Sequence, residues 1–184
     1  MKYQNYQDHR SQIRSGSCLL FKGKSPIARL IRLFTEYSHA AMILKLDQYT
    51  DLKERIFLSE SKANGTVLTL MSNRIKDVDC YIFEPYDLYP VISNKILTSA
   101  LVSAADDIKY DYNGLFRNIF GYTQMGSIAN SYFCSAYIWY EWMQNGLLTD
   151  DRLTEAGRKA IDKNLAPRPC DLTKWINGKL TKIE

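Results

Sequence analysis

The sequence predicts an α+β domain, and two features of the chain indicate it. Segments of strand length fill the first half of the chain, and segments with helical periodicity fill most of the second half. The chain has 184 residues, of which 46% are hydrophobic and 24% charged, which is enough to bury one core. We therefore expect a single domain over residues 1–184, with the polar residues 1–14 as a candidate loose N-terminal arm.

Five apolar runs of the first half have the length and composition of buried strands. They are "SCLLF" (17–21), "YSHAAMILKL" (37–46), "RIFLSES" (55–61), "GTVLTLM" (65–71) and "DCYIFEPY" (79–86).

A short amphipathic helix is predicted after the first strand. Ser25 can cap it, Pro26 suits its first position, and an apolar face follows with helical spacing. That face consists of Ile27, Leu30, Ile31 and Phe34. We expect the helix to pack on the core with its charged side chains in solvent, and contact with a membrane is the alternative.

The second half predicts mainly helices. A Ser-capped helix is expected over 93–110, a short one over 114–120, and a buried one over 133–148 that Gly146 ends. A further helix is expected over 154–164, and Asp171 is a candidate cap in the closing segment.

Charge and hydropathy argue against two classes of function. The 24 basic and 20 acidic side chains are scattered and give a net charge of +4, so we expect no nucleic-acid partner. The N-terminal residues lack the apolar core of a signal peptide, and no apolar run approaches the roughly 20 residues of a membrane span. We expect a cytoplasmic protein, with non-classical export or a phage particle as open alternatives.

The four cysteines do not form a metal-binding or disulfide pattern. Cys18, Cys80, Cys134 and Cys170 are far apart, without a CxxC pair or an adjacent histidine. We expect four reduced thiols, no metal site and no other cofactor.

Cys134 is the candidate nucleophile among these cysteines. It follows "SYF" and falls in the first turn of the predicted helix, where the helix dipole and free N–H groups favour a thiolate. The same N–H groups could stabilise an oxyanion. The alternative is a buried structural cysteine.

His39 and Glu60 could serve that thiol as base and orienting carboxylate. His39 heads a predicted strand and is followed by the small residues Ala40 and Ala41, while Glu60 lies near the end of another strand. Their separation of 21 residues suits two antiparallel neighbouring strands. A buried histidine and an exposed glutamate are the alternatives, and Ser59 and Ser61 are weaker candidates for the orienting role.

The order of these segments resembles that of a known family. "SGSCLLF", "YSHAAMIL", "LSESKANGTVL", "KYDYNG" and "YFCSAYIWY" occur in the order found in permuted papain-like amidases. These amidases are the circularly permuted, YiiX-like branch of the NlpC-type cysteine hydrolases, with lecithin:retinol acyltransferases as distant relatives. The match spans residues 15 to 148, and the departures are Ser17 where Asp is usual, Ala136 after Cys-Ser, and a long gap before Cys134.

The resemblance implies a circularly permuted papain-like fold, in which an antiparallel sheet packs against a helix that carries the nucleophile. It implies Cys134 as nucleophile, His39 as base and acid, Glu60 as the orienting residue, and Tyr110 at the oxyanion. The implied reaction is hydrolysis of an amide, such as a peptide, an amino-acid amide or a cell-wall peptide, through a thioester. Acyl transfer or lipid-ester cleavage by the same thiol, and a catalytically silent binding protein, are the alternatives.

Overall fold

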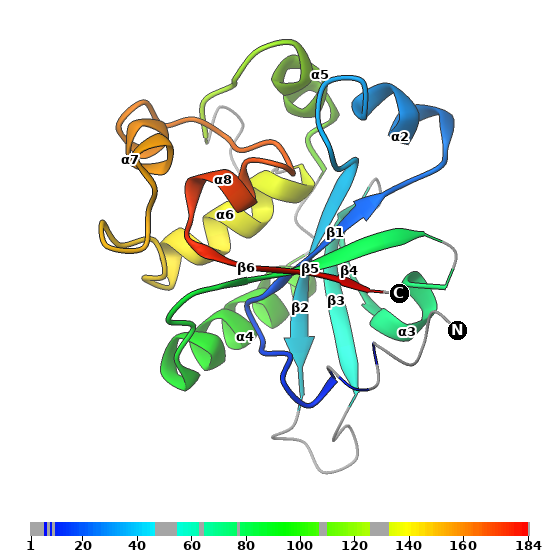
Figure 1. Ribbon diagram of the computed structural model, residues 1–184, viewed down its shortest axis with the longest axis vertical. Helices are drawn as coiled ribbons and strands as arrows, with labels where there is room; N and C mark the ends of the chain where they lie inside the picture. The colour runs from blue at the N-terminus through cyan, green and yellow to red at the C-terminus, as the bar shows by residue number, and fades with distance from the viewer. Residues whose placement is uncertain are drawn as a thin grey trace.

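The structure is a computed structural model that describes residues 6, 8, 10–46, 55–62, 65–76, 78–106, 110–125 and 133–183. Within these residues, six strands form one antiparallel sheet in the order β4-β3-β2-β1-β5-β6 (Figure 1). The strands are β1 (Cys18–Lys22), β2 (His39–Lys45), β3 (Ile56–Lys62), β4 (Gly65–Leu70), β5 (Asp79–Pro85) and β6 (Gly178–Ile183). The five predicted strands are confirmed to within two residues, and β6 was not predicted from the sequence.

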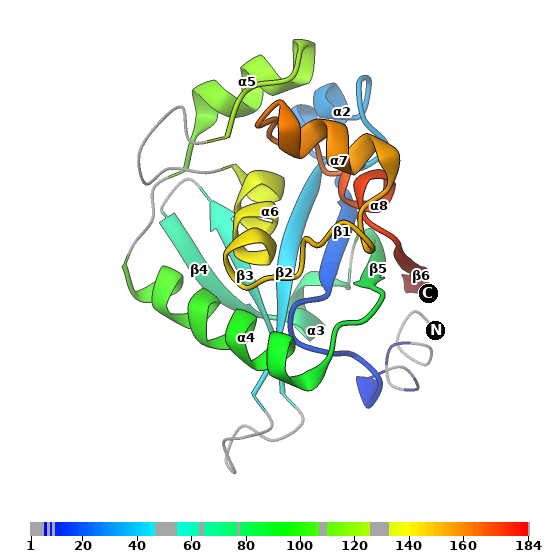
Figure 2. The same cartoon turned by 90° about the vertical axis from the view of Figure 1, so that its left-hand side faces the viewer.

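Helices cover both faces of the sheet. The helices are α2 (Pro26–Ile31), α3 (Met71–Arg74), α4 (Pro90–Ala105), α5 (Tyr112–Phe120), α6 (Cys134–Gln144), α7 (Glu155–Asp162) and α8 (Leu172–Trp175). α4 and α6 pack on one face, α3 packs at β3 and β4, and α7 packs with α8 (Figures 1 and 2). The α+β class and a sheet packed against the helix that begins at Cys134 are therefore confirmed.

The strands of the sheet are apolar on both sides because each side has its own core cluster. Leu20, Met42 and Leu44 lie in the cluster with α4 and α6, whereas Leu19 and Ile43 lie in the cluster on the other face. An antiparallel strand covered on both sides reads as a continuous apolar run rather than as an alternating one. This is why "SCLLF" and "AAMILKL" are apolar without a period of two.

The N-terminal segment is not loose where the structure describes it. Tyr6 and Ile13 are 5% and 4% exposed and belong to the core cluster that contains Ile43 and Met71. The expectation of a loose arm is therefore wrong for these residues. The apolar side chains of this segment stand among polar residues in the sequence, and they pack on the face of the sheet that α4 and α6 leave uncovered.

α2 begins as the sequence predicts, because the Ser25 side chain accepts a hydrogen bond from the N–H of Ala28 at 3.2 Å and Pro26 follows the cap. It packs differently from the prediction. Of its predicted apolar face only Ile31 is buried, because the helix ends there after less than two turns. The expectation that this face packs on the core is wrong for its other three residues, Ile27, Leu30 and Phe34.

The later helices follow the prediction with shifted ends. α4 begins at Pro90, after Tyr89 and not at Ser93, since proline suits a first helical position, and residues 107–109 of the predicted helix lie outside the described residues. Gly146, with φ of 73°, follows α6, and Thr154 caps α7. Asp171 precedes α8, but its side chain accepts from the N–H of Arg168 at 2.9 Å and does not cap that helix.

Two contacts fix α6 on the sheet. The hydroxyls of Tyr137 and of Ser59, on β3, lie 2.9 Å apart, and the indole N–H of Trp142 donates to the carbonyl of Gly16 at 2.8 Å. All four groups are buried or next to the core, so these hydrogen bonds constrain both the rotation and the position of the helix. None of the helices that the structure describes combines the length and apolar character that crossing a bilayer requires.

Candidate active site

Three elements bring the predicted site residues to one end of the sheet. His39 is the first residue of β2, Cys134 is the first residue of α6, and α6 packs against β2 and β3. β2 and β3 are antiparallel neighbours with Met42 paired to Ser59. Continuing this register sets Glu60 opposite Ala41, so His39 and Glu60 lie diagonally on one face.

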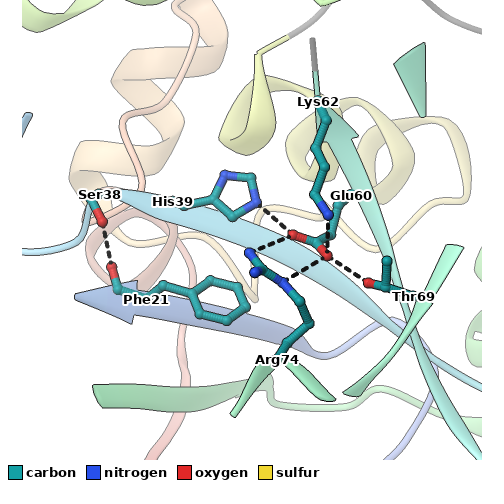
Figure 3. A network of polar contacts seen from close by, with 7 residues as sticks. All are labelled: Phe21, Ser38, His39, Glu60, Lys62, Thr69 and Arg74. Atoms are coloured by element: carbon teal, nitrogen blue, oxygen red, sulfur yellow. Dashed lines mark hydrogen bonds and ion pairs between the residues drawn. The ribbon is translucent and has the colours of Figure 1, made fainter. Parts of the chain in front are cut away.

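The carboxylate of Glu60 contacts the ring of His39. The Nε2 atom of His39 lies 3.1 Å from Oε2 of Glu60 (Figure 3). Glu60 is 0% exposed, whereas the side chain of His39 is 21% exposed. A buried carboxylate at this nitrogen fixes the orientation of the ring and leaves Nδ1 as the nitrogen that can serve the thiol.

Glu60 is itself held by three further side chains. Arg74 of α3 contacts both carboxylate oxygens, through Nε and Nη2, at 3.1 Å each. The hydroxyl of Thr69 donates to Oε1 at 2.6 Å, and Nζ of Lys62 lies 3.0 Å from the same oxygen (Figure 3). Burial would raise the pKa of Glu60, but the hydrogen bond to His39, together with Thr69 and Arg74, holds it well below its ordinary value.

Cys134 interacts with the other side of the histidine. Burial would raise the pKa of the Cys134 thiol, but the charge of His39 and a hydrogen bond to its ring lower it below its ordinary value. The backbone N–H groups of Ala40 and Ser135 add hydrogen bonds that lower this pKa further. Sulfur is therefore favoured as the thiolate at the start of α6.

The same contacts favour the charged form of His39. Burial would lower the pKa of His39, but the neighbouring Cys134 and the carboxylate of Glu60 raise it to about 9. Below that pH the imidazole is protonated, and it lies between the carboxylate of Glu60 and the Cys134 thiol, whose pKa its charge lowers. An adjacent imidazole that lowers the pKa of a thiol is the arrangement by which a cysteine is activated as a nucleophile.

The small residues after His39 divide between the two faces of the sheet. Ala40 belongs to the core cluster with α6, and its N–H bonds to the sulfur, whereas Ala41 belongs to the opposite cluster. Of the two alanines, therefore, only Ala40 lies on the side of the sheet where the thiol is.

Tyr110 lies in the same region as the thiol. It is half buried and packs against a cluster that contains Phe133 and Ala136, the neighbours of Cys134 on the first turn of α6. No side chain in the described residues caps the N-terminus of α6. The part of the first-turn N–H groups of α6, and of Tyr110, in binding an oxyanion stays a prediction.

Arg74, Thr69 and Lys62 are site residues that the sequence did not predict. Of these three residues, only Lys62 could have been found from its sequence position, because it lies two residues after Glu60 and so on the same face of the strand. Arg74 belongs to a four-residue helix that was not predicted, and nothing in its sequence neighbourhood points to Glu60.

The described residues form no group of three or more histidine, cysteine, aspartate or glutamate side chains that could hold a metal ion. All four cysteines are free thiols and all are buried. Burial raises the pKa of Cys18 far above its ordinary value, in contrast to Cys134.

Comparison with known proteins supports the fold. No protein-family model and no curated protein sequence matches this chain. The crystal structure of the metalloprotein YiiX from Escherichia coli O157:H7 superposes with a TM-score of 0.62 at 14% sequence identity, over 94% of this chain and 97% of that chain. By this likeness, the chain has the α+β fold of YiiX.

Proposed function

We propose that this protein is a cysteine hydrolase that cleaves an amide or related acyl bond through a thioester intermediate. The observation that supports it best is His39, whose ring lies between the buried carboxylate of Glu60 and the Cys134 thiol. The likeness to YiiX and the order of the sequence motifs support a permuted papain-like site as its setting.

In the first half of the reaction, the Cys134 thiolate attacks the carbonyl carbon and the carbonyl electrons move to the oxygen. The N–H groups at the start of α6, with Tyr110, bind that oxyanion. His39 gives its Nδ1 proton to the leaving amine as the carbon–nitrogen bond breaks, and the acyl group stays on sulfur as a thioester.

In the second half, His39 is neutral and accepts a proton from a water molecule that attacks the thioester. The carbon–sulfur bond breaks, the acid leaves, and the thiolate and imidazolium form again. Glu60 stays ionised throughout, because its low pKa suits it to orient the ring and to stabilise the imidazolium and not to take up the proton. Peptides and amino-acid amides, including cell-wall peptides, are the proposed substrates, and an amine or alcohol replacing water would give acyl transfer.

The first prediction concerns the covalent intermediate. Incubation with a mixed library of acyl-amide probes should give an acyl adduct on Cys134, identified by mass spectrometry of the intact and digested protein. The mass of the adduct reports the preferred acyl group, and its decay in water with and without added amine separates hydrolysis from transfer.

Two variants control this experiment. Cys134→Ala should abolish both the adduct and the turnover of any substrate found, whereas Cys170→Ala should leave them. Alkylation by iodoacetamide should select Cys134 at neutral pH, because an ordinary thiol with a pKa of about 8.5 is then mostly protonated. Turnover that persists in Cys134→Ala, or alkylation of Cys134 no faster than that of a free thiol, would refute the proposal.

A further inference from the structure

We propose that α2, the turn after it and α5 form a docking site for the surface of an anionic lipid bilayer. We call this surface the docking face. It consists of the apolar side chains Ile27, Leu30, Leu33, Phe34, Phe116 and Phe120, with the cations Lys24, Arg29, Arg32 and Arg117 around them. Figures 1 and 2 both show α2 and α5 beside each other at the same end of the molecule.

The apolar side chains of the docking face are exposed to an unusual extent. Leu33 is 76% exposed and Phe120 is 73% exposed, and the other four members are between 42% and 59% exposed. Single exposed apolar residues are common on proteins, but six on two adjacent elements form a patch, and such patches mark sites of interaction.

Buried contacts between α2 and α5 fix the shape of the docking face. Ile31 of α2 and Leu115 and Ile119 of α5 are buried in one shared cluster. Above them, the rings of Phe34 and Phe120 meet edge to face with centroids 5.3 Å apart. α2 and α5 therefore present their exposed apolar side chains from a preformed base.

The charges around the docking face are of one sign. Lys24, Arg29, Arg32 and Arg117 are exposed, and none of them forms an ion pair within the part of the chain that the structure describes. Residues 23–35 and 112–121 contain no aspartate or glutamate. Glu36, the residue directly after the first of these ranges, is already paired with Lys22 at 2.9 Å.

This combination favours an anionic bilayer over other occupants. In interfacial membrane binding, apolar side chains enter the boundary between headgroups and acyl chains, and neighbouring cations contact anionic lipid headgroups. A second copy of the chain would bring two sets of the same four cations together, which opposes self-association through this face. The bilayer supplies both the apolar medium and the missing negative charge.

The elements of the docking face pack against the start of α6, the helix that carries the thiol. Phe133 and Ala136, on either side of Cys134 at the start of α6, belong to the same buried cluster as Ile31, Leu115 and Ile119. A bilayer on the docking face would thus lie over the end of the sheet where His39 begins β2. Docking itself needs no catalysis, so it stands or falls independently of the proposed reaction.

Vesicle flotation tests the proposal directly. The full chain should float with vesicles of phosphatidylcholine mixed with phosphatidylglycerol and not with phosphatidylcholine alone. Leu33→Ser with Phe120→Ser should reduce the partition coefficient roughly tenfold or more, through lost apolar burial. Arg29→Gln, Arg32→Gln and Arg117→Gln together should reduce it roughly a hundredfold, at about fivefold for each cation.

Matched controls come from α4, at the other end of the molecule. Val91 is 67% exposed, so Val91→Ser removes an exposed apolar side chain outside the docking face and should leave flotation unchanged. Brominated lipids in anionic vesicles should quench the fluorescence of the new tryptophan in Phe120→Trp. They should not quench the fluorescence of the new tryptophan in Val91→Trp. Cys134→Ala should float like the unmodified chain, which separates docking from catalysis.

Several outcomes would overturn the docking site. They are failure to float with anionic vesicles, equal flotation with neutral vesicles, and unchanged flotation of the Leu33→Ser/Phe120→Ser variant. A dimer in analytical ultracentrifugation that this double variant dissociates, in a chain that does not bind vesicles, would assign the face to a second copy instead.

Discussion

At the scale of single residues, Glu60 shows how a buried charge is made stable and useful. Its carboxylate is 0% exposed, and it meets the His39 ring, the Arg74 guanidinium, the Lys62 ammonium and the Thr69 hydroxyl. An unpaired carboxylate in this position would take up a proton. With these partners it remains an anion, and this anion favours the protonated form of His39.

Removal of the Glu60 charge should lower the pKa of His39. His39 carries its proton below about pH 9 in the unmodified chain, since Cys134 and Glu60 raise its pKa. In Glu60→Gln one of the two anions is gone, so the ring should lose its proton at a lower pH. The chain has two histidines, so an NMR titration of their ring protons can follow His39, with His9→Gln as the assignment control.

The matched control for this titration is Glu84→Gln. Glu84 lies on β5 and pairs with Arg14 at 3.6 Å, away from the histidine, so its replacement should leave the His39 titration in place. A His39 pKa that stays near 9 in Glu60→Gln would show that Glu60 does not support the imidazolium.

At the scale of elements, the contact between Tyr137 and Ser59 connects the two halves of the site. Tyr137 lies one turn after Cys134 on α6, and Ser59 precedes Glu60 on β3, with their hydroxyls 2.9 Å apart in the core. Since the helix carries the thiol and the strand carries the carboxylate, this hydrogen bond helps to set the position of one against the other.

A double-mutant cycle measures that contact. Tyr137→Phe leaves the Ser59 hydroxyl without its partner, and Ser59→Ala does the same for Tyr137, so each should lower the free energy of unfolding by about 1–2 kcal/mol. The double variant should cost less than the sum of the two, because it leaves no unpaired group. Urea unfolding gives the three values, and strict additivity would show that the hydroxyls do not interact.

The elements differ in how far the sequence could predict them. The buried strands were visible as apolar runs, and α6 was visible from its aromatic face and Gly146. β6, "GKLTKI", was not, because an edge strand with two lysines pairs on one side only and lacks an apolar run. The exposed face of α2 was also misjudged, since periodicity shows that a face is apolar but not what covers it.

The residues of the candidate site also differ in how far the sequence could predict them. Cys134, His39 and Glu60 could be selected because their residue types, order and strand positions resemble a known arrangement. Arg74 could not, because its contact with Glu60 depends on the turn from β4 into α3, which packs a four-residue helix against the sheet. Such a long-range ion pair has no signature in spacing.

At the scale of the whole molecule, the sheet is closed on its second face by the N-terminal segment. Ile13 is 4% exposed and shares a cluster with Leu19, Ile43 and Met71. The helices after residue 90 leave this face to α3 and to the start of the chain, so the N-terminal residues contribute to the core.

Truncation of Ile13 tests that contribution. Ile13→Ala should lower the free energy of unfolding by about 2–4 kcal/mol, since a buried isoleucine loses its contacts and leaves a cavity. Gln12→Ala, at an exposed neighbouring position, should change it by no more than about 0.5 kcal/mol. Thermal or urea unfolding distinguishes the two, and an Ile13→Ala variant as stable as Gln12→Ala would mean that the segment is loose after all.

The late position of α6 also has a consequence for synthesis on the ribosome. His39 and Glu60 leave the translating ribosome 74 residues or more before Cys134, a delay of roughly 4–15 s at about 5–20 residues per second. During that interval β1 to β5 can pair, but no thiol faces the histidine. In the proposed mechanism the nascent chain therefore carries the base and its carboxylate without a nucleophile, and the reaction can begin only once the second half has been made and α6 has docked on the sheet.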